Sequence, residues 1–496
     1  MIFRNWVMQN FPFLEDDFDA LTDYELFCKM MGYVKKFAED NEDFRKQLAY
    51  YENYFNNLDL QEEVNKKLDE MALDGTLENL ISQYIQLSTT YVYDTVEDMK
   101  EATNLVDGSY MRTSGFYSYN DGGGSLYHAR EIINTDVIDE ITLIALSDEN
   151  LVAELIIENE MNVKQFGAKG DGETDDTDFI QSCLDNCKNI IINNGTYMID
   201  SETSILPKSN TNIDIINATL KAITNDLSTY NIILLDNVSN VIIKGNGIIQ
   251  GDKTTHTGVS GEHGHCVKIT GNSNNIALKD LKIIDAWGDG VYIGQSSNIL
   301  CDNLKIDNNS RNGISVTYTD NLKILNSLIT GTNRTNPKAG IDIEPNNDET
   351  CSNILIDNCV IKNNSEKGIQ FANSHYDTNP NAINNINITN CIIDNCKEGI
   401  RPEYTNKLIV SSNTIINNAT CGIDMTKQDN TVIDNNVISN NGYAINFYIC
   451  NKNLISNNIC SNCSTTNPVF NIQASTCNIY TTFIIKYFVI IKFIIS

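Results

Sequence analysis

Two acidic side chains, Asp342 and Glu344, lie two residues apart in a stretch of alternating apolar and polar residues. On a β-strand such residues face the same side, about 7 Å apart. Glycoside hydrolysis needs one carboxylic acid to protonate the leaving oxygen and one carboxylate to attack or to activate water, about 5 to 9.5 Å away. Asp289, two repeats earlier, is a third candidate. We predict Asp289, Asp342 and Glu344 as catalytic residues; the alternative is that outward strand residues are acidic only because they meet water.

Polar and aromatic side chains accompany these carboxylates in neighbouring repeats. After each Gly-Ile-like pair, the first outward positions are Tyr292, Ser315, Asp342, Gln370, Arg401, Asp424 and Asn446. Polar groups of this kind bond sugar hydroxyls, and aromatic faces stack on sugar rings. The predicted substrate-binding residues are Tyr292, Arg311, Gln370, His375, Arg401, Glu403 and Asp424.

The element that must position these side chains is a repeat that covers residues 285–460. Its glycine anchors recur every 22 to 31 residues, a period typical of solenoids. The apolar residues alternate, as in Ile354 and Ile356, which is the periodicity of strands and not of helices. Each repeat therefore supplies short strands that pair in parallel with the next repeat, about 4.8 Å away. The pattern predicts a parallel β-helix.

Asparagine and glycine mark the bends of each repeat. The turn positions are Asn303, Asn326, Asn358, Asn390, Ser412, Asn435 and Asn457. Asparagine tolerates the left-handed backbone region that such a bend needs, and stacked amides can bond from one repeat to the next. The glycine before each Ile strand is expected to serve a sharp corner in the same way.

The composition of the chain limits the classes of partner it can bind and the compartment in which it folds. The chain has 496 residues, a formal net charge of −30 and a pI near 4.4, which argues against a nucleic-acid groove. None of the 14 cysteines has the spacing of a zinc or redox motif, so we expect buried free thiols and folding in a reducing cytoplasm. The amino terminus lacks the apolar core of a signal peptide, so release by another route such as lysis is expected.

The segments before the repeat differ in character. In residues 1–90 a capping box at Thr22–Glu25 opens a run of apolar residues with 4-3 spacing, which predicts a short self-associating coiled coil; a helical hairpin within one chain is the alternative. Residues 91–160 predict a small β-rich module with a short helix after Thr95. The Asp121-Gly-Gly-Gly run lacks the Lys and the helix of a phosphate loop and predicts a turn.

Residues 162–181 read Asn-Val-Lys-Gln-Phe-Gly-Ala-Lys-Gly-Asp-Gly-Glu-Thr-Asp-Asp-Thr-Asp-Phe-Ile-Gln. This stretch resembles the opening signature of the pectate-lyase superfamily. The branch concerned contains rhamnogalacturonase-like and epimerase-like domains and many phage tail spikes. The resemblance implies a right-handed β-helix over residues 161–465 and a helix over its open end. Asp175, Asp176 or Thr177 would cap that helix, which makes these carboxylates structural. Residues 1–90 resemble the virion-attachment end of tail proteins from phages of Gram-positive bacteria.

The polygalacturonase pattern is only partly present. Trp287-Gly-Asp289-Gly is similar to its first motif, but Arg311-Asn312 replaces the paired aspartates, and no histidine follows on the next repeat. His263 and His265 are interpreted as surface histidines of a turn in preference to a zinc site. The polygalacturonase mechanism therefore cannot be transferred whole, and no metal ligands are predicted.

These observations lead to one hypothesis: an all-β chain, with a parallel β-helix behind a helical segment, that binds and depolymerises a bacterial surface polysaccharide. Its expected place is the virion tail at the host surface, joined to tail or baseplate proteins through residues 1–90. We expect a homo-oligomer, a trimer by resemblance, with no nucleic-acid or membrane partner. No cofactor is expected, except Ca²⁺ if the protein is a lyase.

Three alternatives remain: a non-enzymatic receptor-binding fibre, a polysaccharide lyase, and a secreted pectinolytic enzyme. The apolar tail 466–496 is either a closing strand or a replaced end, and its Lys486 and Lys492 make it a poor membrane span.

Overall fold

The computed structural model describes residues 90–259, 261–463, 470–473 and 476–483, and from the first segment residues 25, 26, 29, 66–68, 70 and 71. They fall in two compact units, one formed by residues 1–119 and 124–156, the other by residues 120–123 and 157–496. The predicted coiled coil, its self-association and the attachment role of residues 1–90 lie outside the described residues, as does the tail from residue 484 onward.

The first unit contains a five-stranded sheet with the order β1-β2-β3-β5-β4. Its strands are β1 (Thr90–Tyr93), β2 (Tyr110–Thr113), β3 (Leu126–Glu131), β4 (Leu143–Ala145) and β5 (Leu151–Leu155). The helix predicted after Thr95 is confirmed as α6 (Val96–Lys100), whose capping box joins Thr95 and Asp98. Asp121 forms the predicted turn, because its carboxylate accepts a hydrogen bond from the Gly123 amide at 2.7 Å.

The second unit opens with β6 (Met161–Asn162), the 3₁₀-helix η2 (Val163–Phe166), β7 (Asp171–Asp175) and α7 (Thr177–Asn186). The Asp175 carboxylate accepts from the amide of Thr177 at 3.0 Å, at the start of α7. Asp176 is buried and accepts from the amides of Lys169 and Gly170 at 2.7 and 3.1 Å. The carboxylates of the opening signature therefore shape the loop and the helix start, as predicted.

Three rows of parallel strands follow, after the long strands β8 (Asn189–Ile199) and β9 (Asn212–Ala222). The first row is a ten-stranded sheet of β10 (Thr229–Asp236), β13 (His263–Thr270), β16 (Val291–Ile293), β19 (Ile314–Val316), β22 (Ile341–Ile343), β25 (Lys367–Ala372), β28 (Glu398–Glu403), β31 (Cys421–Thr426), β34 (Tyr443–Tyr448) and β36 (Phe470–Gln473).

The second row is β11 (Ser239–Lys244), β14 (Ser273–Lys279), β17 (Ser296–Asp302), β20 (Thr319–Leu325), β23 (Cys351–Asp357), β26 (Ile383–Thr389), β29 (Asn406–Ser411), β32 (Val432–Asp434) and β35 (Asn451–Ser461). The third row is β12 (Ile248–Gln250), β15 (Lys282–Ile284), β18 (Lys305–Asp307), β21 (Leu328–Thr330), β24 (Val360–Lys362), β27 (Ile392–Asp394), β30 (Thr414–Ile416) and β33 (Val437–Ser439). The last strand, β37 (Thr476–Phe483), pairs with β35, so paired strands continue beyond residue 465.

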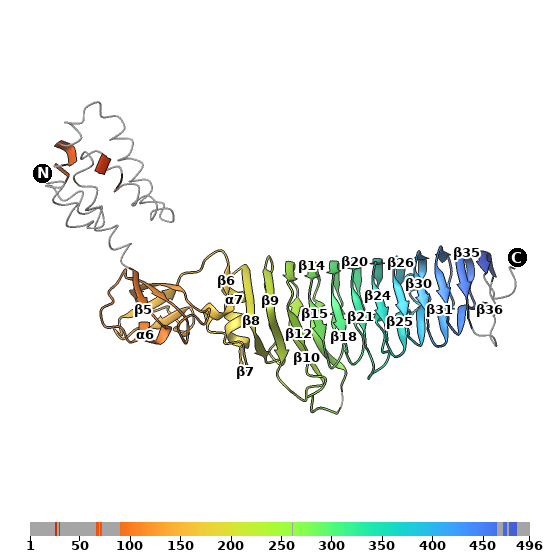
Figure 1. Cartoon of the computed structure of the whole chain (residues 1–496), viewed down its shortest axis with the longest axis horizontal. Helices are drawn as coiled ribbons and strands as arrows, with labels where there is room; N and C mark the ends of the chain where they lie inside the picture. Colours follow the sequence, from red (N-terminus) through yellow and green to blue (C-terminus); the bar gives the residue numbers. More distant parts are fainter. Residues whose placement is uncertain are drawn as a thin grey trace. The chain divides into compact units, whose positions relative to one another are not determined.

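The rungs follow one another in sequence order, as the change from yellow to blue along the strands in Figure 1 shows. Each strand pairs in parallel with the strand one rung later, for example β20 with β23 and β23 with β26. Inward residues such as Ile354 and Ile356 are buried, and Leu355 between them is half-buried. The predicted parallel β-helix is confirmed, and it is right-handed.

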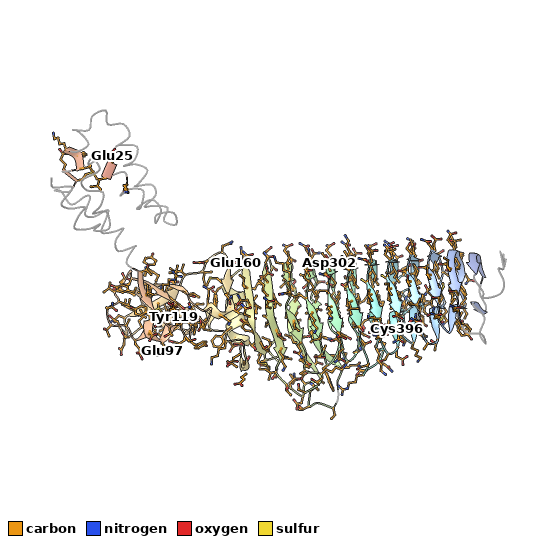
Figure 2. The ribbon with its side chains drawn as sticks, in the orientation of Figure 1. Glu25, Glu97, Tyr119, Glu160, Asp302 and Cys396 are labelled. Atoms are coloured by element: carbon orange, nitrogen blue, oxygen red, sulfur yellow. The ribbon has the colours of Figure 1, made fainter. Side chains whose placement is uncertain are left out.

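The predicted asparagine bends are also confirmed. All seven turn positions have a positive φ, from 52° at Asn326 to 60° at Ser412. Their amides form a ladder: Asn326 donates to Asp302 at 2.7 Å, and Asn358 donates to Asn326 at 2.8 Å. Asp302 is labelled at the outer edge of the stack in Figure 2. These bonds join neighbouring rungs at the surface.

Glycine is required at the anchor positions for a different reason from the one expected. None of the anchors from Gly290 to Gly422 is among the glycines with a positive φ, so a left-handed corner does not explain them. Instead, a Cβ at Gly368 would lie 2.5 Å from the carbonyl oxygen of Gly399 and 2.7 Å from a methyl group of Ile393. Glycine is required because the next rung and the core leave no room for a side chain.

Substitution of Gly368 by Ala should therefore destabilise the β-helix. The added methyl group must displace backbone as well as core atoms, a form of overpacking that costs on the order of 1–3 kcal/mol. We expect a lower Tm in differential scanning calorimetry. Ala444 occupies the last anchor and is already buried there, so Ala444→Gly is the matched control, with an expected change below about 1 kcal/mol. Equal Tm values for Gly368→Ala and the wild type would contradict this account.

The twelve cysteines from Cys183 to Cys463 are free, and all but Cys463 are buried, as the sequence predicted. Cys396, labelled in Figure 2, is one of them. Burial raises the pKa of its thiol to about 11, which makes it a poor nucleophile. Every helix within the described parts of the chain is too short or too polar to cross a bilayer.

Candidate active site

The outward row predicted from the repeat is present on the first row of strands. Tyr292 pairs with Ser315, Ser315 with Asp342, and Asp342 with Gln370. The next pairings are Gln370 with Arg401 and, further on, Asp424 with Asn446. Residues from β16 to β34 therefore share one face because the strands keep their register from rung to rung.

Asp289 and Asp342 meet at a third residue, Asn312. Asp289 precedes β16, Asn312 precedes β19 on the next rung, and Asp342 lies in β22 one rung later. The Asn312 amide donates to Asp289 Oδ1 at 3.0 Å, and its side-chain nitrogen donates to Asp342 Oδ2 at 3.2 Å. Two of the three predicted catalytic carboxyls are thus held by one asparagine. They are 0% and 1% exposed, in contrast to the water-facing positions expected.

A cation and an imidazole complete the surroundings of Asp289. Arg311 Nη1 lies 3.1 Å from Asp289 Oδ2 and 3.3 Å from the Ser315 hydroxyl. His265 Nδ1 lies 3.4 Å from Asp289 Oδ2 and 3.3 Å from the Asp289 amide nitrogen. Arg311, predicted to bind substrate, therefore positions a carboxylate.

The interpretation of His265 as a surface histidine is wrong. It lies in β13, one rung before Asp289, and is 2% exposed. Its ring stacks on Tyr292 with the centroids 5.0 Å apart, and the Tyr292 hydroxyl bonds Thr317 at 2.9 Å. The Glu262 carboxylate approaches Arg311 Nε at 4.0 Å. The predicted binding residue Tyr292 thus lies against the carboxylate cluster.

Burial governs the protonation of this cluster. Desolvation, helped by the nearby Glu344 carboxylate, raises the pKa of Asp342 to about 7. Desolvation also raises the pKa of Asp289 to about 6, against the opposing effect of the Arg311 charge. The same burial lowers the pKa of His265, so this imidazole is neutral at pH 7. Near neutrality the site combines a carboxylic acid with a carboxylate, which is the pairing that acid–base catalysis requires.

One oxygen of Asp342 has no partner. Its Oδ1 is buried and makes no hydrogen bond to the described protein, while Oδ2 accepts from Asn312. A buried polar atom of this kind costs free energy unless it carries a proton or meets a ligand. Oδ1 is therefore the atom at which a proton would be held and delivered.

Asp342→Asn should remove a pH-dependent loss of stability. The unfolded carboxyl titrates near 3.8 and the folded one near 7, so between these pH values only the folded state holds the proton. Wild-type stability contributed by this group therefore falls as the pH rises from about 4 to 7, by up to about 1.4 kcal/mol per pH unit.

The asparagine variant cannot titrate. Its Tm relative to that of the wild type should rise between pH 4.5 and pH 8, and scanning calorimetry at both values measures this. A Tm difference that is the same at the two pH values would contradict a raised pKa at Asp342.

Three of the remaining predicted binding residues, Arg401, Glu403 and Asp424, form a second group on β28 and β31, further along the first row of strands. Arg401 Nη1 lies 3.2 Å from a Glu398 oxygen and 3.9 Å from Asp424 Oδ2. Glu403 lies at the other end of the same strand, β28. Gln370, between Asp342 and Arg401 in the row, links the two groups.

His375 lies in the loop after β25. Its carbonyl oxygen accepts from the amides of Thr378 and Asn379, and its own amide donates to Asn373. None of these contacts joins it to the carboxylate cluster. Glu344 follows β22 and is half-buried, so it is the more accessible of the three predicted catalytic carboxyls.

Three members of the cluster were missed by sequence reasoning: Glu262, His265 and Asn312. A signal for His265 exists, because it stands 24 residues before Asp289, within the range of one repeat. Asn312 was noted only as a departure from the paired aspartates. Among the described residues, no group of three or more His, Cys, Asp or Glu side chains is arranged to hold a metal ion.

Known proteins share the architecture. The tailspike protein gp49 from Acinetobacter baumannii bacteriophage Fri1, a capsular polysaccharide depolymerase, is 14% identical with a TM-score of 0.56; the match covers 78% of this chain and 75% of that chain. The A-module of mannuronan C-5 epimerase AlgE4 from Azotobacter vinelandii is 15% identical with a TM-score of 0.55, over 65% of this chain and 95% of the module. Identities this low show the fold alone.

The uncharacterised protein YclG of Bacillus subtilis strain 168 is 29% identical over an alignment of 226 residues, and the match covers 37% of this chain and 38% of YclG. The chain thus matches well under half the length of this relative. Residues 182–385 and 348–484 match the family model described as "Right handed beta helix region". Because these matches cover more than half of the chain, the protein belongs to the right-handed β-helix family.

Proposed function

We propose that the protein binds a bacterial surface polysaccharide along the first row of strands and hydrolyses it at the Asp289–Asn312–Asp342 cluster. The observation that carries this proposal is the pair of buried carboxyls held by one asparagine, Asn312. Burial raises the pKa of both carboxyls, and of the two only Asp289 is paired with Arg311, whose charge opposes this rise. A carboxylic acid beside a carboxylate is the pair of groups that glycoside hydrolysis uses.

Each residue has a role in this proposal. Asp342 donates the proton to the leaving glycosidic oxygen, since a pKa raised to about 7 leaves a large share of its carboxyls protonated near neutral pH. Asp289 acts as the carboxylate, since Arg311 and the Asn312 amide stabilise its charge. Glu344 raises the pKa of Asp342 through its negative charge. Tyr292 and the group around Arg401 contact sugar units on either side.

A second candidate is a receptor-binding fibre without turnover. The burial of Asp289 and Asp342 favours it, because a substrate must move covering groups before it reaches Oδ1 of Asp342. A lyase is the third candidate; it would need a base beside an acidic sugar, often with Ca²⁺.

The role in a phage tail, the assembly and the location of the protein are part of the same proposal. The similarity in fold to a tailspike depolymerase supports a phage tail-spike role. In this proposal residues 1–90 also attach to tail or baseplate proteins, and the assembly is homo-oligomeric and trimeric. The protein would then be made in the host cytoplasm and act, as part of the virion, at the surface of the next host. Light scattering of the purified chain measures the number of subunits.

The deciding experiment incubates the purified protein with a panel of bacterial capsule and wall glycans. Release of reducing ends without the ultraviolet absorbance of unsaturated sugars supports hydrolysis. Reducing ends with such absorbance would establish a lyase instead. Binding without any release would establish the fibre, and neither binding nor release from host glycans would reject the proposal.

A further inference from the structure

A stack of four flat groups lies beside the carboxylate cluster. The rings of Tyr230 and His256 stack with centroids 6.0 Å apart, and those of His256 and Trp287 stack at 3.9 Å. The guanidinium carbon of Arg334 lies 3.3 Å from the centroid of the Trp287 ring. Trp287 is 4% exposed, so its two faces are occupied by His256 and Arg334.

The inner end of the stack is fixed by a buried carboxylate. Asp252 is 1% exposed and accepts hydrogen bonds from the Tyr230 hydroxyl and the Asn225 amide, the latter at 3.1 Å. It also lies 2.9 Å from His256 Nδ1. Because Asp252 anchors two of the three rings, Trp287 is a rigid platform for the arginine above it.

The stack belongs to the same site. The Arg334 amide donates to the carbonyl oxygen of Ser310 at 3.0 Å, and Ser310 directly precedes Arg311. Trp287 stands two residues before Asp289. The main chain that carries Arg334 is therefore bonded to the main chain that carries the ion-pair partner of Asp289.

Arg334 is exposed to solvent, and its guanidinium group forms no ion pair or hydrogen bond with any residue that the structure describes. Two nearby cations are occupied: Arg311 pairs with Asp289, and the Lys253 amine donates to both oxygens of Asn308 and to Asn333, at 2.8 to 2.9 Å. Lys268 lies over the ring of Tyr292, at 5.4 Å from its centroid. Arg334 is thus a cation without an anionic partner among the described residues, in a chain of net charge −30.

We propose that Arg334, held flat on Trp287, is a subsite for an anionic group of the glycan, a carboxylate or a phosphodiester. The inference rests on the proposed function and adds the substrate class, an anionic polysaccharide. The stacked face leaves the N–H edge of the guanidinium free, and this edge fits two oxygens of one anion. Stacking also fixes the side chain before binding, so little conformational entropy is lost on association.

The test compares binding of matched glycans by the full-length protein in titration calorimetry. One pair is a uronate-containing capsule and its carboxyl-reduced form; the other is a phosphodiester-linked glycan and a neutral polymer of the same sugars. The wild type should bind the anionic member of one pair more tightly, and that pair identifies the anion. Arg334→Ala should weaken binding of that anionic glycan about 10- to 100-fold and leave the neutral one unchanged.

Two further variants separate the effect of the guanidinium shape from that of positive charge alone. Arg334→Lys keeps the charge without the flat double donor and should recover only part of the affinity. Lys323→Ala removes one exposed positive charge from β20, in the second row of strands, and should change nothing. Arg334→Ala also removes the contact with Trp287, and because such a contact stabilises only weakly at an exposed site, the Tm of this variant should fall only slightly. The Tm of Lys323→Ala should equal that of the wild type.

Two outcomes overturn the inference while the proposed function stands: tight binding of a neutral glycan with no effect of Arg334→Ala, or an equal loss for anionic and neutral glycans. If the wild type binds no member of either pair and no host glycan, the proposed function fails and the inference fails with it.

Discussion

Asp342→Asn should lower the rate of polysaccharide hydrolysis by about 100- to 10,000-fold, the usual contribution of a general acid. The amide has the shape of the carboxyl and can still accept the hydrogen bond from Asn312, but it cannot deliver a proton. The affinity for the glycan should change little, so the loss should appear in kcat. Reducing-end release with the glycan identified by the panel measures it.

Asp289→Asn should cause a loss of similar size for a different reason. The variant removes the negative charge that pairs with Arg311, and with it the base or nucleophile. Glu344→Gln is the informative comparison, because Glu344 contacts neither Asn312 nor Arg311 in the described residues and acts on Asp342 through charge. We expect a smaller loss for this variant. Full activity of Asp342→Asn together with loss in Glu344→Gln would show that the acid was assigned to the wrong carboxyl.

The pH dependence of the wild type provides a separate check. The active form has Asp342 protonated and Asp289 ionised, so the rate should fall below pH 6, where Asp289 gains a proton. It should also fall above pH 7, where Asp342 loses one. The expected kcat/KM profile is therefore a narrow bell with its maximum between pH 6 and 7. A rate that still increases above pH 8 would contradict this assignment.

Asn436→Ala should produce the largest loss of stability, on the order of 3–5 kcal/mol. Asn436 is 1% exposed and donates through its side chain to the carbonyl oxygens of Val410 and Asp434 and to the side chain of Asn458. Its own oxygen accepts from the amide and the side chain of Asn413, at 2.9 and 3.0 Å. Alanine would leave several buried groups without partners and open a cavity between three rungs.

The neighbouring residue supplies the control. Asn435 is exposed, has a φ of 55° and makes one side-chain bond, to Ser412 at 3.3 Å. Asn435→Gly keeps the permitted backbone and loses only this surface bond, so a change below about 1 kcal/mol is expected. Tm and denaturant midpoints measure both variants. Equal destabilisation by the two substitutions would show that the buried hydrogen bonds of Asn436 contribute no more to stability than the surface bond of Asn435.

Much of the fold follows from local chemistry that is visible in the sequence. Asn326 and Asn358 occupy a backbone region that few other residues accept, so their spacing predicted the bends. Alternation of residues such as Ile354 and Ile356 predicted the strands. Because each rung repeats these features, the register of the outward row from Tyr292 to Asn446 could also be predicted, and with it the neighbours of Asp342.

The chemistry of the cluster depended on the tertiary structure. Whether Asp342 is a water-facing carboxylate or a buried acid with a pKa near 7 is decided by burial, which the alternation of residues along the strand does not reveal. The contact of His265 with Asp289 joins residues one rung apart, and the stacking of Arg334 on Trp287 joins loops of unequal length. The repeat by itself determined which residues could be neighbours, whereas desolvation and side-chain contacts, which exist only in the folded chain, decided which of them can hold a proton.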